Sequence, residues 1–175
     1  MGSLQLIASA NADSGTRTTA FAFTSIPQTY TDLLLYLSLR GTDGGTEGYA
    51  KIFINNNETT AYSLTQAQGA GTSVIVAQNT GLDQWRFIIP NSGGGSLEFS
   101  ATYVYIPLYT LTNINKQASI SSNQTNTSSG GSRNTNEVVA FTGQTSAINR
   151  LDIFCMSGNL QQYSSVYLYG IDSTP

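Results

Sequence analysis

The sequence predicts an all-β protein: a jelly-roll-like sandwich of two antiparallel sheets, folded as a single domain over residues 1–175. Three observations predict this fold. Short runs of alternating apolar and polar residues recur along the chain, and Gly, Asn and Pro residues separate them. No segment has the spacing of a long amphipathic helix, and only residues 30–35 and 160–163 favour a single helical turn. Ten or eleven short strands in a chain of this size commonly close as a two-sheet jelly roll.

The first half of the chain contains the run that we expect at the centre of a sheet. Leu33 to Arg40 (LLLYLSLR) is apolar on both faces for most of its length, which is typical of a central strand. Ser25-Ile26-Pro27 marks a break before it, because proline rarely lies within a central strand. The strands expected in this half are residues 4–8, 19–23, 33–40, 50–55, 62–64, 73–78 and 84–89.

The second half contains the longest alternating run, Leu97 to Ile106. Side chains alternate between the two faces of a strand, so one face of this run carries Phe99, Ala101, Tyr103 and Tyr105. Residues 116–122 have the polar pattern of an edge strand. The remaining expected strands are residues 137–142, 148–156 and 166–171.

Segments rich in Gly, Ser and Asn predict the connections. Asn55-Asn56-Asn57 predicts a hairpin turn, because asparagine tolerates positive φ. Residues 123–136 (NQTNTSSGGSRNTN) are polar and of low complexity, so we expect an exposed, mobile loop there. The other expected loops are residues 41–48 (GTDGGTEG), 66–71 and 92–96.

Charge is sparse along the whole chain. Charged residues make up 10% of the sequence, against about 25% in a typical soluble domain. The seven basic residues are scattered and the net charge is −3, whereas nucleic-acid binding needs several phosphate contacts. We therefore expect no nucleic-acid partner. The polar surface must come from Ser, Thr, Asn, Gln and Gly, a composition that suits packing against other proteins.

The residue types that carry most enzyme chemistry are scarce. The sequence has no histidine, which removes the commonest general base and metal ligand. Its single cysteine, Cys155 in LDIFCM, cannot form an internal disulfide and is expected to be a small buried hydrophobe. The loop with Asp43 and Glu47 lacks the dense acidic pattern of a calcium site. We expect no enzymatic activity, no catalytic residue, no cofactor and no metal.

The N-terminal segment MGSLQLIASANA has no basic region, and its apolar run is too short for a signal peptide. Leu6 stands where a myristoylation signal needs Ser or Thr. No stretch approaches the 18 or so consecutive apolar residues that span a membrane. The expectation is therefore synthesis in the cytoplasm, no export by a standard route and no membrane partner.

Tyrosines gather in the later strands: Tyr103, Tyr105, Tyr109, Tyr163, Tyr167 and Tyr169. They suit packing in the core and on sheet faces. Alternatively they form a contact surface for carbohydrate or protein, because tyrosine combines a large apolar area with a polar tip. The sequence leaves both interpretations open.

Three parts of the chain carry a family resemblance. Phe23 to Leu33 contains F-T-S-I-P-x-T-Y-T-D-L, and residues 50–55 match a strand and turn that follow it. The third part is Y-I-P at 105–107 with Lys116, A-I-N-R-L at 147–151, and the ending L-Y-G-I at 168–171. This combination spans nearly the whole chain and resembles the jelly-roll capsid decoration (cement) proteins of tailed phages. Residues 138–141 (VVAF) depart from that family, which often has a Trp there.

The resemblance implies a virion structural protein that binds the major capsid protein and stabilises the shell, often as a homotrimer. It places the protein on the capsid surface, after synthesis in the host cytoplasm. We expect Leu4, Leu6 and Ile7, or the first loop with Asp43 and Glu47, to contact the partner. Residues 1–10 would then be a docking strand or an arm that adds to a neighbour's sheet.

Related domains also occur in head fibres and tail structures. The alternative function is therefore a head-fibre or tail-fibre domain that binds host surface glycan. The tyrosine cluster and the loops at 41–48 and 123–136 would form its binding surface. An enzyme, such as a polysaccharide hydrolase, is disfavoured by the missing histidine and the sparse charge.

Overall fold

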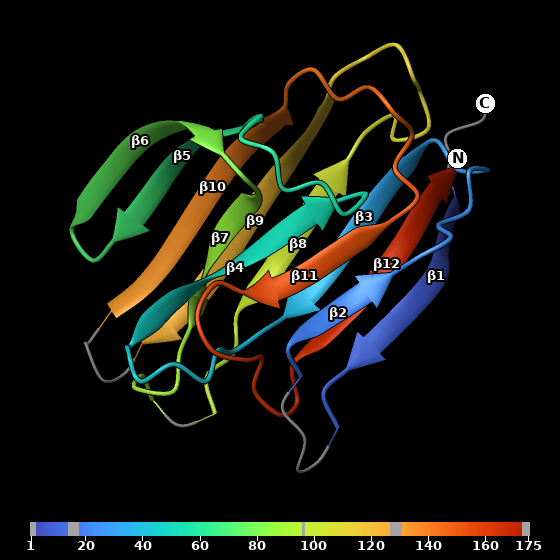
Figure 1. Ribbon diagram of the computed structural model, residues 1–175. Coiled ribbons are helices and arrows are strands. Elements are labelled where there is room, and N and C mark those ends of the chain that lie inside the picture. Colours follow the sequence, from blue (N-terminus) through green and yellow to red (C-terminus); the bar gives the residue numbers. More distant parts are fainter. Residues whose placement is uncertain (1–2, 14–17, 96, 127–130, 173–175) are drawn as a thin grey trace.

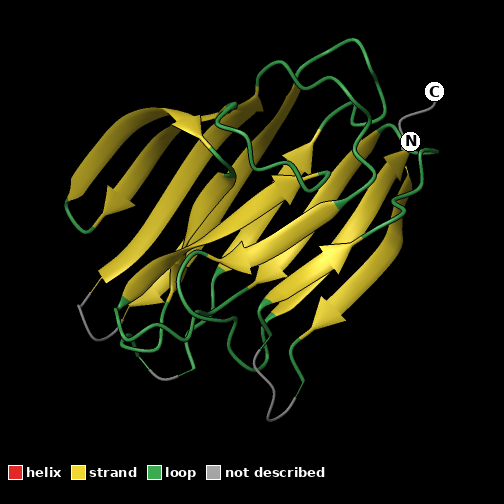
Figure 2. Ribbon diagram, viewed as in Figure 1, coloured by secondary structure: helices red, strands yellow, loops and turns green. Residues whose placement is uncertain are grey.

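The computed structural model describes residues 3–13, 18–95, 97–126 and 131–172. These residues form twelve strands and no helix, so the all-β prediction is confirmed (Figure 2). In the described part of the chain no helix is long and apolar enough to cross a membrane. The strands are β1 (Ser3–Asn11), β2 (Ala20–Phe23), β3 (Asp32–Ser38), β4 (Glu47–Ile54), β5 (Tyr62–Ala70), β6 (Ser73–Leu82), β7 (Trp85–Pro90), β8 (Ala101–Ile106), β9 (Lys116–Asn126), β10 (Gly131–Phe141), β11 (Leu151–Cys155) and β12 (Ser165–Asp172).

Eight of the strands form a jelly roll. If β5, β6, β9 and β10 are set aside, the remaining strands make two antiparallel sheets with the orders β1-β12-β3-β8 and β2-β11-β4-β7. Consecutive strands then lie in facing sheets, except β4 and β7, which pair within the smaller sheet. This is the double Greek-key arrangement of a jelly roll. Figure 1 shows the smaller sheet lying over the larger one. The predicted two-sheet sandwich is therefore confirmed.

Two inserted hairpins widen the larger sheet. The β5–β6 hairpin lies between β4 and β7 in the chain, and the β9–β10 hairpin lies between β8 and β11. Because β9 pairs with β8 and β10 pairs with β5, the sheet continues in the order β1-β12-β3-β8-β9-β10-β5-β6. We call the four added strands the wing; in Figure 1 it lies on the side away from β1.

The core lies between the two sheets. Leu33, Leu35 and Leu37 of β3 point into it, and β3 lies between β12 and β8, as its apolar sequence predicted. Trp85 and Phe87 of β7 are fully buried on the opposing sheet. The larger sheet thus has an inner face, which packs on this core, and an outer face turned away from the smaller sheet.

Two predicted loops are wrong, because they are mostly strand. Residues 66–70 belong to β5, and residues 123–126 and 131–136 belong to β9 and β10; residues 127–130 lie outside the described residues. The predicted edge strand at 116–122 is also wrong, because β9 lies between β8 and β10. Glycine and asparagine have low strand propensity, but pairing with neighbouring strands overrides it.

The other local predictions had mixed outcomes. The helical turn predicted at 30–35 is wrong, because β3 occupies most of that segment. Residues 160–163 do contain a turn, closed by a hydrogen bond from the Ser164 N–H to the Gln161 carbonyl at 3.0 Å, but the φ of 71° at Tyr163 is not helical. Strand β8 begins at Ala101 and not at Leu97, which has a φ of 68° that interrupts an extended strand. The predicted alternation within β8 is confirmed, as is the positive φ at Asn55 and Asn56.

Candidate binding surface on the larger sheet

Three tyrosines form a row across the outer face of the larger sheet. Tyr167 of β12 pairs with Tyr36 of β3, which pairs with Tyr103 of β8. Their side chains are 43%, 37% and 44% exposed, and the Tyr36 ring meets the Tyr103 ring edge-on with 4.9 Å between centroids. A hollow of about 170 Å³ beside this tyrosine row is also lined by Ser38 and Ser165. The row therefore presents aromatic surface to solvent next to small polar side chains.

A second row lies beside the first. Leu6, Tyr169, Leu34 and Tyr105 pair in turn across β1, β12, β3 and β8. The Tyr105 hydroxyl donates to Asp32 Oδ2 at 2.9 Å, and the Leu108 N–H donates to Asp32 Oδ1 at 2.8 Å. Burial, and after it the hydrogen bond with Asp32, raises the pKa of Tyr105. These bonds hold Tyr105 in place, and the Tyr36 and Tyr169 rings, 5.6 Å apart between centroids, join the two rows into one patch.

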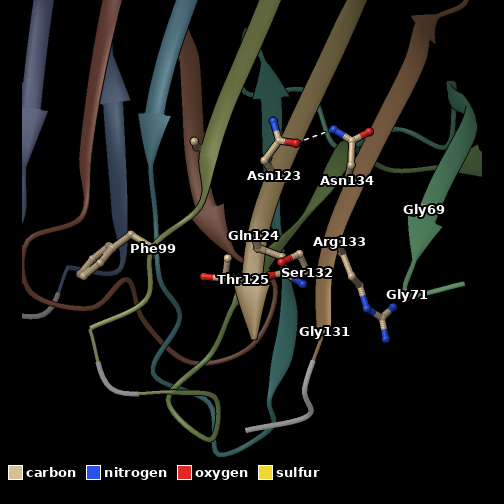
Figure 3. A pocket seen from close by; sticks show the side chains of 11 residues that line it. Gly69, Gly71, Phe99, Asn123, Gln124, Thr125, Gly131, Ser132, Arg133 and Asn134 are labelled. Carbon is tan, nitrogen blue, oxygen red and sulfur yellow. Dashed lines mark hydrogen bonds between the residues drawn. The ribbon is translucent and has the colours of Figure 1, made fainter. Parts of the chain in front are cut away.

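A larger hollow, of about 630 Å³, is lined by residues of β8 and of the wing strands β5, β9 and β10 (Figure 3). Ala101 lines both hollows. The side-chain amides of Asn123 on β9 and Asn134 on β10 hydrogen-bond to each other across its wall. Its lining is completed by Gly69, Gly71, Phe99, Gln124, Thr125, Gly131, Ser132 and Arg133. Amide, hydroxyl, aromatic and guanidinium groups thus line the hollow together with glycines and Ala101.

The predicted docking strand lies at one edge of the larger sheet. Leu4 and Leu6 of β1 are 52% and 56% exposed, whereas Ile7 is half-buried against the core. Of the two alternatives predicted for residues 1–10, a docking strand or an arm, the described residues form a strand, because β1 pairs with β12 from Ser3 to Asn11, with a bulge after Leu6. A docking role for Leu4, Leu6 and Ile7 stays a prediction, now for a sheet edge.

The predicted docking residues of the first loop lie elsewhere. Asp43 is exposed, and its carbonyl oxygen accepts a hydrogen bond from the Ser92 hydroxyl at 2.6 Å. Glu47 is the first residue of β4, and its carboxylate forms an ion pair with Arg133 on β10 at 2.6 Å. Because β10 belongs to the wing and β1 is the opposite edge strand, the five predicted residues do not form one site.

Two surface features were missed by the sequence prediction. Tyr36 lies within the apolar run of β3, which hid its place at the centre of the tyrosine row. Strand β6 is the second edge of the larger sheet, and Val74, Ile75 and Val76 are exposed on it. The strand itself was predicted at 73–78, but its exposed edge was not; the three successive apolar residues are the signal that could have marked it.

The titratable side chains of Cys155 and Glu137 are buried in the protein. Burial raises the pKa of the Cys155 thiol to about 11, with the charge of Asp43 adding to the effect. Burial raises the pKa of Glu137 to about 8, and the positive charge of Arg86 opposes that shift. No three His, Cys, Asp or Glu side chains of the described residues are grouped to hold a metal ion.

Comparison of the chain with protein-family models, curated proteins and solved structures gave no match.

Proposed function

We propose that the protein is a structural component of a tailed-phage virion: a capsid decoration protein that docks on the major capsid protein. The observation that carries the proposal is the state of the two edges of the larger sheet. Neither β1 nor β6 contains a charged residue, and both expose aliphatic side chains. Proteins that act as monomers usually protect such edges with charges or proline. An open edge is suited to strand addition by a neighbouring protein.

Three further features support this function. The jelly-roll order of the strands agrees with the fold that the sequence resemblance implies. The low content of charged residues suits a protein that stays bound to other proteins. On a symmetric shell, each contact is repeated in every copy, so weak contacts at the sheet edges suffice for stable attachment. The resemblance adds a homotrimer as the arrangement that we propose on the shell.

The test is binding to expanded shells of the major capsid protein, measured by co-sedimentation. The double variant Leu4→Lys and Leu6→Lys places charges on the β1 edge, and we expect bound protein to fall at least about tenfold. Val138→Lys is the matched control, because Val138 is exposed on the outer face but lies on β10, within the sheet. Circular dichroism verifies the fold of each variant. Undiminished binding of the double variant, or no sedimentation of the wild type, would overturn the proposal.

A second candidate function is glycan binding by a head-fibre or tail-fibre domain. The observation that favours it is a pair of adjacent hollows that share Ala101, one beside the tyrosine row and one at Asn123 and Asn134. Aromatic rings pack on the apolar faces of sugars, and amides and hydroxyls bond to sugar hydroxyls. The tyrosine row and its two flanking serines carry no charge, which suits a neutral saccharide.

A glycan array, followed by adsorption to host cells, separates the two functions. If the protein binds glycan, Tyr36→Ala and Asn123→Ala should each weaken binding by about tenfold or more. The Leu4 and Leu6 double variant should bind glycan as the wild type does. Loss of shell binding in that double variant, with no glycan bound by the wild type, would favour the capsid function.

A further inference from the structure

Strand β6 is an edge that nothing in the described chain covers. It is the last strand of the larger sheet, and it pairs along one side only, with β5. Val74 and Val76 lie on the outer face and are 76% and 73% exposed, and Ile75 lies on the other face and is 45% exposed. Figure 1 shows the β5–β6 hairpin projecting from the sandwich. Strand β6 is thus open along its free backbone edge and on both faces.

The residue order of β6 is symmetric about Ile75. Val74-Ile75-Val76 reads the same in both directions, and small residues, Ser73 and Ala77, flank it. In an antiparallel pair of two β6 strands with Ile75 at the centre, Val74 of one copy lies opposite Val76 of the other. Ile75 then faces Ile75 on the opposite face of the sheet. Apolar side chains therefore meet on both faces.

Charge also favours a second copy as the occupant. None of the ten residues of β6 is charged, so two identical edges meet without like-charge repulsion. A two-fold contact of this kind is self-complementary: one surface on each copy provides the whole interface. The free backbone groups of the edge gain partners, as they do when a strand is added to any sheet.

We propose that β6 joins two copies of this chain edge to edge, by antiparallel pairing about Ile75. The two eight-stranded sheets then form one continuous sheet through the interface. This contact stands on the β6 edge and does not depend on the virion function. A two-fold contact cannot close a three-membered ring, so it would link neighbouring homotrimers and not build one.

Disulfide trapping tests the register. Facing residues of an antiparallel pair have Cα atoms about 4.5–5.5 Å apart, within the range that a disulfide spans. Ile75→Cys should therefore give a covalent dimer under mild oxidation, seen on a non-reducing gel. The only native cysteine, Cys155, is buried and does not compete.

Two matched variants control the trapping experiment. Val74→Cys alone and Val76→Cys alone should link poorly, because residues two positions out of register lie about 7–8 Å apart. A mixture of the Val74→Cys and Val76→Cys chains should link, because these positions face each other. Ile75→Cys that links no faster than Val76→Cys would overturn the proposal. So would faster linking of Ile75→Cys to a Leu6→Cys chain, which indicates pairing of β6 with β1.

The mass in solution provides a readout without cysteine. Light scattering at high protein concentration should show an even number of chains for the wild type. Val76→Lys should halve that mass, because a charge on the edge blocks pairing. Val138→Lys, the same change within the sheet on β10, should leave the mass unchanged. A wild type that is monomeric, or whose mass Val76→Lys does not alter, would overturn the proposal.

Discussion

The ring of Tyr30 lies directly over Gly170. A Cβ placed on Gly170 would come within 2.3 Å of the Cγ atom of that ring. Gly170 lies in β12 and pairs with Leu33 of β3, and the Thr31 N–H donates to the Ile171 carbonyl at 2.9 Å. The T-Y-T-D-L motif and the L-Y-G-I ending therefore form one contact, and the glycine makes room for the ring.

Gly170→Ala should lower the free energy of unfolding by about 1–3 kcal/mol, because the added methyl group displaces the Tyr30 ring. Tyr30→Ala should also destabilise the protein, but the double variant should lose less than the sum of the two single variants. Urea unfolding measures all three. Gly69→Ala is the control, because nothing lies within 4 Å of a Cβ at that strand glycine. Additive losses would contradict the contact.

The second prediction concerns the attachment of the wing to the core. The rings of Tyr62 on β5 and Phe141 on β10 stack with 3.9 Å between centroids, and both side chains are buried. Phe141→Ala leaves a cavity there, and we expect a loss of about 3–5 kcal/mol in unfolding free energy. Val138→Ala, on the exposed face of the same strand, should change it by less than about 0.5 kcal/mol. Equal effects of the two substitutions would contradict this role.

The jelly-roll part of the fold was predictable because its strands alternate or are apolar throughout. Strand β8 shows the alternation directly, with Val104 and Ile106 buried and Tyr103 and Tyr105 exposed. The wing was not predictable in the same way. The polar residues of β9 and β10 become strand because Asn134 pairs with Asn123 on one side and Gly69 on the other. This pairing between distant segments cannot be inferred from the local sequence.

The candidate surfaces were predictable only in part. Residues 4–8 were expected as a strand and Leu4 and Leu6 as docking residues; both leucines are exposed on β1, but its place at the sheet edge was not predicted. Tyr36 was hidden, because a continuous apolar run does not show which face is buried. The separation of Glu47 from Leu4 and Leu6 depends on the long-range strand order, which places β4 and β1 in different sheets.

The third prediction is that Cys155 is unreactive in the folded protein. Burial raises the pKa of its thiol to about 11, so little thiolate exists at neutral pH. Reaction with a thiol reagent should be at least about a hundredfold slower in the native protein than in denaturant. The control is Met156→Cys, which puts a second thiol at an exposed neighbouring position and should react in the native state. Fast labelling of native wild-type protein would contradict the burial.

The fourth prediction is a pH dependence that arises from Glu137. Glu137 is buried on the inner face of β10, two residues from the buried Thr135, which pairs with the buried Gln68 of β5. The folded pKa of about 8 lies above the ordinary value of 4.5, so the folded protein keeps a proton that the unfolded chain has lost. The free energy of unfolding should therefore fall as the pH rises from about 4.5 to about 8, by up to about 5 kcal/mol.

Glu137→Gln tests this dependence, because the amide stays neutral at every pH. Its stability should match the wild type near pH 4 and exceed it by several kcal/mol near pH 8.5, which urea unfolding across this range measures. Glu58→Gln removes an exposed carboxylate and should leave the wild-type slope unchanged. A wild-type stability that is flat or rising from about pH 5 to pH 8 would show that Glu137 is ionised in the folded protein. In that case Arg86, the positive charge that opposes the shift, would hold the carboxylate in its charged form.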